Sequence, residues 1–182
     1  MIEGGAGDEP ELASDLDADI AALIGVAQYV APPVMAANEP NVRAMCAAVE
    51  NGNPAWWDED AGRELLGGAY CPATMLPVWG RPDVWQPGEG APPKALQAHF
   101  DLKDRLGFPA SVAVSYTTSF FAPVAIGDAL ATQQMIRSIG PVKTTRLGTG
   151  RFWTVEMQYL GADGAMIGIE SYEFFGFVKD AA

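Results

Sequence analysis

The chain has 182 residues, of which 49% are hydrophobic and 19% are charged, a composition typical of one folded domain rather than of a disordered chain. Its formal net charge is −12, and a field of that sign repels phosphate backbones, which argues against nucleic-acid binding. The sequence contains no run of about 18 apolar residues, so we expect no membrane-spanning helix.

The first third of the chain predicts helices separated by short breaks. Residues 1–14 are rich in Gly and acidic side chains, and we expect a mobile tail there. Apolar side chains recur at helical spacing over residues 15–24 and 40–49, and residues 58–66 also favour a helix. A short strand is predicted over residues 26–31, which two prolines follow.

The remainder of the chain predicts an antiparallel sheet. Residues 67–93 are dense in Pro, Gly and Trp, and we interpret them as an insertion in a single domain that spans residues 15–180. After a short element near residues 95–102, four strand-like stretches follow at 111–121, 129–138, 146–160 and 165–178. Gly140-Pro141 indicates a turn between two of them. Helices followed by such a meander predict an α+β fold, with a helix packed on one face of the sheet.

Charge is distributed unevenly along the chain. Residues 1–42 hold eight acidic side chains and no basic one, whereas residues 129–155 hold four basic side chains and no acidic one. The four are Arg137, Lys143, Arg146 and Arg151. We expect this second segment to attract an anionic ligand, although a solvated hairpin surface is an equally good interpretation of any single one of them.

The cysteines and the N-terminal residues indicate the cellular compartment. Cys46 and Cys71 form neither a disulfide framework nor a metal-ligand spacing, so we expect reduced, buried thiols and no metal site. The N-terminal residues lack the basic segment and apolar core of a secretory leader. Together these features predict a cytoplasmic protein.

One short motif carries the functional hypothesis. Residues 50–58 read Glu-Asn-Gly-Asn-Pro-Ala-Trp-Trp-Asp. This stretch resembles the Gly-Asp-x-Asn-Pro-x-His signature of the MaoC-like enoyl-CoA hydratases, or hydratase 2 family, whose Asp and His act on water and protons. Asn53 and Pro54 match the signature, but Asn51 stands at the Asp position and Trp56 at the His position. Neither replacement exchanges a proton near neutral pH, so no catalytic residue is expected at this motif.

Two further passages support the resemblance. Residues 121–128 are similar to the F-x-P-V-x-x-G-D turn of these domains, and residues 147–152 are similar to the N-terminal half of MaoC-type dehydratases. The resemblance covers about residues 20–178. It implies a hot-dog fold, in which a curved antiparallel sheet wraps a central helix, with Asn53-Pro54 at the end of that helix. Hot-dog subunits commonly pair by joining their sheets edge to edge.

Within this family the chain is most similar to the larger, non-catalytic subunit of heteromeric hydratases that act on steroid side-chain enoyl-CoA thioesters in actinobacteria. The resemblance implies that this chain binds a bulky enoyl-CoA while a partner hot-dog subunit supplies the catalytic Asp and His. An α2β2 assembly is expected, and a downstream aldolase is a further partner of some such subunits. Coenzyme A enters as part of the substrate, and no other cofactor is implied.

The resemblance also suggests residues that bind the substrate. Side chains proposed to line the acyl cavity or its mouth are Asn53, Trp57, Met75, Leu76, Trp79 and Trp85, with Trp56 adding apolar surface at the motif. Ordinary core or interface packing is the alternative for these side chains. The four basic residues of segment 129–155 are proposed to hold the phosphates of coenzyme A.

Two rival functions remain open at this level. One is a self-sufficient homodimeric 3-hydroxyacyl-thioester dehydratase that uses atypical residues, with Glu50 and His99 as the candidates. The other is a non-enzymatic scaffold that binds acyl thioesters. Turnover by the isolated chain separates the first from a non-catalytic subunit. Calorimetry with bulky and short acyl-CoAs tests the second, and no binding of any thioester would leave only a structural role.

Overall fold

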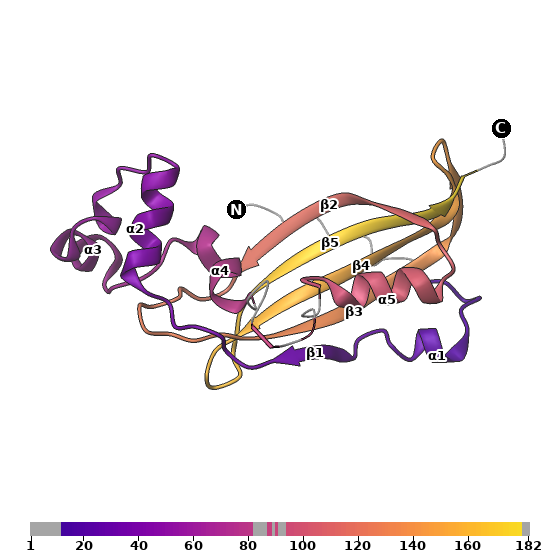
Figure 1. The fold of residues 1–182 in the computed structure, drawn as a ribbon, viewed down its shortest axis with the longest axis horizontal. Coiled ribbons are helices and arrows are strands. Elements are labelled where there is room, and N and C mark those ends of the chain that lie inside the picture. Colours follow the sequence, from indigo (N-terminus) through magenta and orange to yellow (C-terminus); the bar gives the residue numbers. More distant parts are fainter. Residues whose placement is uncertain (1–11, 82–86, 89, 91–93, 180–182) are drawn as a thin grey trace, which may run out of the picture.

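The structure of the protein is a computed structural model that describes residues 12–81, 87–88, 90 and 94–179. These residues form a five-stranded antiparallel sheet and several helices (Figure 1). In chain order the elements, with η for a 3-10 helix, are α1 (Ala18–Ala21), β1 (Ala27–Ala31), α2 (Glu39–Ala48), η1 (Pro54–Trp56), α3 (Glu59–Leu66), η2 (Ala73–Met75), α4 (Leu76–Gly80), α5 (Gln97–Arg105), β2 (Ala110–Phe120), β3 (Ala131–Thr145), β4 (Gly148–Leu160) and β5 (Met166–Val178).

The sheet has the strand order β1-β3-β4-β5-β2, with every neighbouring pair antiparallel. Strands β3, β4 and β5 form a long meander, and β2 reaches the far edge by pairing with β5. Strand β3 is longer than the sequence predicts because it continues through Gly140-Pro141. Its register shifts between Ile139 and Val142, and this bulge accommodates the proline, which has no N–H for the ladder.

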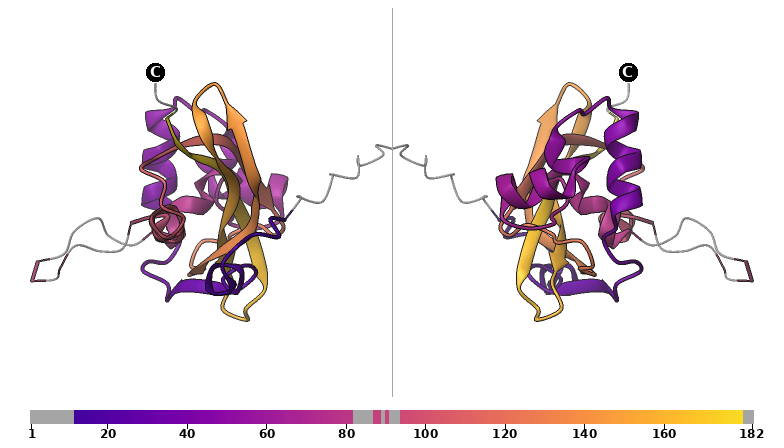
Figure 2. Two further views of the ribbon diagram at one scale, coloured as in Figure 1. Left: turned by 90° about the vertical axis from the view of Figure 1, so that its right-hand side faces the viewer. Right: turned by 90° about the vertical axis from the view of Figure 1, so that its left-hand side faces the viewer.

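Helix α5 lies along one face of the sheet, and α2 lies on the same side of it (Figures 1 and 2). Ala98 and Leu102 of α5 are buried in a core cluster with Ile136, Trp153 and other apolar side chains of the sheet. The buried Gln134 side chain of β3 accepts a hydrogen bond from Ala98 N at 2.9 Å. That bond satisfies one of the free N–H groups of the first helical turn and so attaches the helix to the sheet.

The expectation that Asn53-Pro54 ends the central helix is wrong. The helix before this motif is α2, and Figure 1 shows α2 and α3 beyond the end of the sheet. Only Val42 and Cys46 of α2 are buried, so α2 covers an end of the sheet rather than its face. The central helix is α5, in the region for which the sequence predicts only a short element.

A second core cluster joins the helices at the end of the sheet to the strands. It contains Trp79 of α4, Cys46 of α2 and Tyr159 of β4, together with the adjacent Met75 and Leu76. Helices η2 and α4 lie within residues 67–93, the stretch interpreted from the sequence as an insertion. The apolar side chains of this stretch fold it into short helices because burying them removes their surface from water.

The N-terminal part of the described chain also packs on the sheet. Ala13 N donates a hydrogen bond to Ile139 O at 2.8 Å, and Asp15 pairs with Arg151 at 2.7 Å. Helix α1 is a single turn, shorter than the predicted helix over 15–24, and buries only Ile20. Residues 13–15 are therefore attached to β3 and β4, and the rest of the predicted tail, residues 1–11, lies outside the described residues.

Candidate functional site

The motif loop follows α2 and is shaped by its own side chains. Glu50 has a φ of +53° and reverses the chain, after which Asn51 N donates to Cys46 O at 2.8 Å. The side-chain oxygen of Asn51 accepts from Asn53 N at 3.1 Å, and that of Asn53 accepts from Ala55 N at 3.1 Å. Pro54 then starts η1. The two side chains thus hold the backbone of this loop, which is a structural role.

The two tryptophans of the loop line a small cavity of about 140 Å³ between α2, η1 and α3. Trp56 is half-buried and packs against the core cluster of α4. Trp57 donates from Nε1 to Asn51 O at 2.7 Å and is 41% exposed. Tyr70 and Ile126 complete the apolar part of the wall. At the position where the family signature has a histidine, this chain therefore presents apolar surface.

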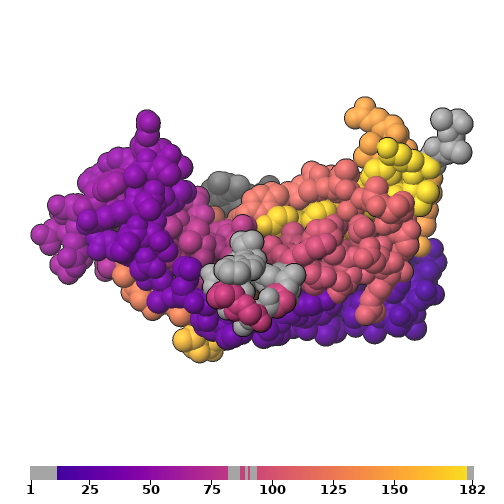
Figure 3. Space-filling view, viewed as in Figure 1, coloured from indigo at the N-terminus to yellow at the C-terminus, as the bar shows by residue number. Residues whose placement is uncertain are grey.

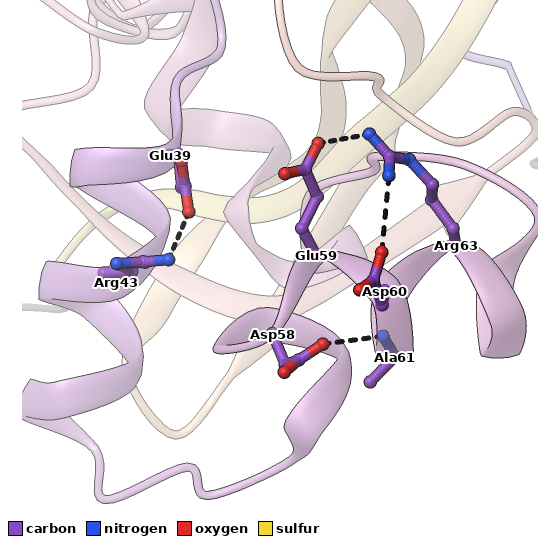
Figure 4. Close-up of polar contacts among 7 residues, drawn as sticks. All are labelled: Glu39, Arg43, Asp58, Glu59, Asp60, Ala61 and Arg63. Atoms are coloured by element: carbon purple, nitrogen blue, oxygen red, sulfur yellow. Dashed lines mark hydrogen bonds and ion pairs between the residues drawn. The ribbon is translucent and has the colours of Figure 1, made fainter.

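The rim of this cavity is acidic. Glu39, Asp58 and Glu59 belong to its lining, and each is engaged locally (Figure 4). Glu39 pairs with Arg43, Glu59 pairs with Arg63, and the side chain of Asp58 accepts from Ala61 N at 2.9 Å as the cap of α3. We call residues 39–66 the helical lobe; Figure 3 shows it as a projection at one end of the molecule. Its cavity suits an apolar group and disfavours a phosphate.

His99, the only histidine of the chain, lies on α5 in the core and is 4% exposed. Its Nδ1 accepts from Trp153 Nε1 at 3.2 Å, so Nε2 carries the proton and faces Ser111 Oγ at 3.2 Å. The ring also stacks on Phe174, with centroids 3.7 Å apart. Burial, with a smaller effect of Lys103, lowers the pKa of His99 to about 4. His99 therefore acts as a neutral link between α5 and the sheet.

Three of the side chains predicted to contact substrate lie in the core instead. Met75, Leu76 and Trp79 are each almost fully buried in the cluster that joins α4 to the sheet. They pack as core because η2 and α4 are covered by both the lobe and the strands. Trp85 lies outside the described residues. Of the predicted lining, the structure places Trp57 at a cavity and Asn53 on the exposed surface next to it.

The four basic residues of segment 129–155 do not converge. Arg151 is 8% exposed and donates to Asp15 Oδ2 at 2.7 Å and to Gly140 O at 3.0 Å. The Arg137 guanidinium pairs with Glu156 of β4 at 3.2 Å. Odd-numbered and even-numbered residues of the regular strand β4 point to opposite faces of the sheet, so Arg151 and Glu156 lie on opposite faces. Arg137, which pairs with Glu156, therefore lies on the face opposite Arg151. The prediction that Arg137 and Arg151 bind the same phosphates together is therefore wrong.

Lys143 and Arg146 remain as candidates near the β3–β4 turn. Both are exposed, and neither forms an ion pair with another described residue. Lys143 lines an open cavity of about 310 Å³ together with Pro141, Phe152 and Glu173. These two side chains are available to an anion, whereas the guanidinium groups of Arg137 and Arg151 are already paired.

A third cavity involves residues that sequence reasoning missed. Glu170 of β5 is 2% exposed and accepts hydrogen bonds from the hydroxyls of Tyr116 and Tyr159, each at 2.6 Å. It lines a cavity of about 210 Å³ beside Tyr159 and Tyr172. Burial raises the pKa of Tyr159 and of Tyr172, and the hydrogen bond to Glu170 raises that of Tyr159 further. Both hydroxyls therefore keep their protons. Strand β5 contains two Glu residues, Glu170 and Glu173, and the sequence does not show that only Glu170 is buried.

Metal and membrane features are absent from the part of the chain that the structure describes. No group of three or more His, Cys, Asp or Glu side chains gathers there as a metal site. None of the described helices is long and apolar enough to cross a bilayer. Cys46 and Cys71 are free and buried, and burial, with a smaller effect of Asp128, raises the pKa of the Cys71 thiol to about 11.

Comparison with solved structures identifies the fold. A chain of the ChsH1-ChsH2 complex from Mycobacterium tuberculosis superposes with a TM-score of 0.71 at 18% identity, over 90% of this chain and 91% of that one. A MaoC-like dehydratase from Rhodospirillum rubrum superposes with a TM-score of 0.55 at 15% identity, over 93% of this chain and 99% of that one. The fold is therefore the predicted α+β hot-dog fold.

Comparison of sequences adds one relative. The chain is 28% identical over 147 residues to a protein of Thermomonospora curvata described as a probable enoyl-CoA hydratase alpha subunit. The match covers 77% of this chain but only 44% of that protein, so the chain spans less than half the length of this relative. No family model matches the chain. This relative and the structural neighbours agree with the predicted resemblance to the MaoC-like hot-dog family.

Proposed function

We propose that this chain is the substrate-holding subunit of a heteromeric enoyl-CoA hydratase, in which a partner hot-dog subunit supplies the catalytic Asp and His. The observation that carries the proposal is the geometry of the motif loop. Asn51 holds the loop backbone, and Trp56 packs against the core where the signature has its histidine. Hydration of an enoyl thioester needs a base for water and an acid for the α-carbon, and neither side chain is one.

The core position of His99 supports the same division of labour. Both of its nitrogens face partners within the protein, and its lowered pKa keeps it neutral and enclosed. Glu50, the other candidate of the self-sufficient alternative, is an exposed residue that turns the chain after α2. Neither residue lines one of the cavities described above. These positions favour a partner as the source of the proton-transfer groups.

The free edge of β2 is the proposed contact with the partner. Strand β2 pairs only with β5, so the backbone groups on its other side are unpaired among the described residues. Large apolar side chains are exposed along this edge and just beyond it: Val112, Val114, Tyr116, Phe120 and Phe121. An unpaired strand with such side chains favours the addition of a strand from a second subunit. The neighbour of known structure is itself part of a two-component complex.

The proposal extends to the assembly and the substrate. Joining two such pairs gives the α2β2 arrangement, and the proposed substrate is a bulky acyl group such as a steroid side chain. Lys143 and Arg146 are proposed to approach the phosphates of coenzyme A, because they are exposed and lack acidic partners among the described residues.

Turnover measured with and without the partner tests the proposal. The chain alone should not hydrate a bulky enoyl-CoA, measured as loss of the conjugated thioester absorbance, and the chain with its catalytic hot-dog partner should. Appreciable turnover by the chain alone would overturn the division of labour. Binding of acyl-CoA that never leads to turnover with the partner would instead indicate a scaffold.

The contact at β2 has a matched control within the sheet. Val114 is 50% exposed on the free edge strand, and Val142 is 52% exposed on β3. Val114→Glu should weaken association with the partner by at least about tenfold, because a charge would be buried at an apolar contact. Val142→Glu should leave association unchanged. Equal effects of the two variants would place the partner elsewhere.

A further inference from the structure

The cavity beside Glu170 lies on the helix-facing side of the sheet. Phe174 of β5 and Trp153 of β4 belong to the core cluster under α5. Glu170 lies four residues from Phe174 along β5, so it points to the same face of the sheet. Tyr159 lies six residues from Trp153 along β4 and also points to that face. The C-terminal residue of α4, Gly80, closes one side, with so little space that a Cβ there would lie 2.8 Å from the Tyr159 ring. The cavity is thus open to solvent beside the exposed Arg81 and Ala95, and it is separate from the lobe.

The carboxylate retains capacity to accept a further hydrogen bond. Each of its oxygens receives one tyrosine hydroxyl, at 2.6 Å, and a carboxylate has about four acceptor positions in all. Thr118 Oγ donates to the Tyr116 hydroxyl at 2.8 Å, which orients that hydroxyl toward Glu170. A buried carboxylate held by oriented donors is a strong and directional acceptor at the wall of a cavity.

The other walls of the cavity limit which ligands can reach the Glu170 carboxylate. Ala95, Leu96 and Met157 contribute apolar surface, which suits a hydrocarbon body. Arg81 lines the same cavity, so a cationic ligand is repelled by it, while Glu170 repels an anionic one. At about 210 Å³ the cavity is smaller than the ~300–1,000 Å³ typical of complete ligand sites. It therefore suits one neutral ring at the end of a larger molecule.

We propose that this cavity recognises a hydroxyl group on an alicyclic ring, with Glu170 as the acceptor for the hydroxyl hydrogen. Glu170 is a specificity-determining residue in this scheme and takes no part in the chemistry at the thioester. The inference rests on the proposed function in treating the ring as the far end of a bulky acyl group. It predicts that acyl groups with a ring hydroxyl are preferred over those with a ring ketone.

Small probes test the cavity without coenzyme A or a partner subunit. Cyclohexanol and cyclohexanone have nearly the same shape, but only the alcohol donates a hydrogen bond. Their dissociation constants for the full chain are measured by titration of amide NMR shifts. Cyclohexanol should bind more tightly by about tenfold or more, because the bond is to a charged acceptor. Equal affinities, no binding of either probe, or tighter binding of cyclohexylammonium would each overturn the proposal.

Two variants and one control locate the effect. Glu170→Gln presents a donor as well as an acceptor and should reduce the preference to less than about threefold. Glu173→Gln changes a carboxylate that lines a different cavity from the same strand and should leave the preference intact. Ala95→Trp fills the cavity from an exposed position, where the core is not disturbed, and should abolish binding of both probes. A preference that survives Glu170→Gln or Ala95→Trp would place the probe elsewhere.

The outcome separates this inference from the proposed function. Failure of the probes, with hydratase activity of the complex intact, would remove only the hydroxyl specificity. Failure of the complex to hydrate any enoyl-CoA, with the probe preference intact, would leave a ring-binding cavity in a protein of another function.

Discussion

Acidification is expected to destabilise this protein through His99 before its carboxylates titrate. The unfolded chain protonates its histidine near pH 6.5, whereas the folded chain keeps His99 neutral until about pH 4. The unfolded state therefore binds more protons between these values, and folding stability falls as the pH is lowered through that range. Above pH 6.5 the contribution is complete, and below about pH 4 no further loss comes from this residue.

The size of this loss of stability follows from the difference between the pKa values of His99 in the unfolded and folded chain. Each pH unit between about 6.5 and 4 removes about 1.4 kcal/mol, so about 2 kcal/mol is lost by pH 5 and at most about 3 kcal/mol by pH 4. That is a large part of the stability of a typical domain, about 5–15 kcal/mol. Urea unfolding followed by tryptophan fluorescence at pH 8, 7, 6 and 5 measures it, since the five tryptophans provide the signal.

His99→Phe is the control, because a phenyl ring keeps the stacking on Phe174 and removes the titration. The variant should be less stable at pH 8 by about 1–3 kcal/mol, because Trp153 Nε1 loses its acceptor. Its stability should nevertheless change little between pH 7 and 5. If wild type and variant lose the same free energy over that range, the buried neutral histidine is not the cause and the reasoning fails.

The remaining predictions concern an ion pair, two tryptophans and the side chains proposed to contact coenzyme A. Asp15→Asn should lower stability in urea unfolding, because the buried Arg151 loses its carboxylate, and Asp17→Asn should have no such effect. Trp79→Ala should cost about 3–5 kcal/mol in the same assay, whereas Trp57→Ala, at an exposed indole, should cost less than about 2 kcal/mol. Lys143→Ala with Arg146→Ala should weaken acyl-CoA binding several-fold by calorimetry, and Arg137→Ala should not, since its guanidinium is already paired with Glu156. An effect of Arg137→Ala as large as that of the double variant would contradict this assignment.

The sheet could be predicted from the sequence because its strands alternate apolar and polar side chains and are separated by turn residues. The central helix could not be recognised in the same way. Helix α5 contains mostly polar residues and buries little beyond Ala98, His99 and Leu102, so its apolar face is narrow. Helix α2 has a clearer apolar pattern but covers only the end of the sheet. Which helix lies along the sheet is decided by tertiary packing, such as the bond between Gln134 and the first turn of α5.

The candidate sites show a similar limit. The motif at residues 50–58 predicts both the family and the loss of proton-transfer groups, because those depend on residue identity. The prediction for the basic segment was wrong because Arg137 and Arg151, which are close in sequence, lie on opposite faces of the sheet. Glu170 was missed because its hydroxyl partners, Tyr116 and Tyr159, come from two other strands. Sites of this kind are built by pairing between strands, which the order of residues alone does not reveal.

The packing of Trp56 has a consequence for how this loop can change over time. A histidine at this position would be smaller and more polar, so reinstating the signature there would remove apolar volume from the wall of the lobe and from its contact with the core. An aspartate in place of Asn51 would keep the hydrogen bond to Asn53 N, but alone it would provide half of a proton relay. A path back to independent chemistry therefore passes through a less stable protein that gains nothing at the first step. In the proposed heteromer, the loop therefore makes the division of labour between the two subunits difficult to reverse.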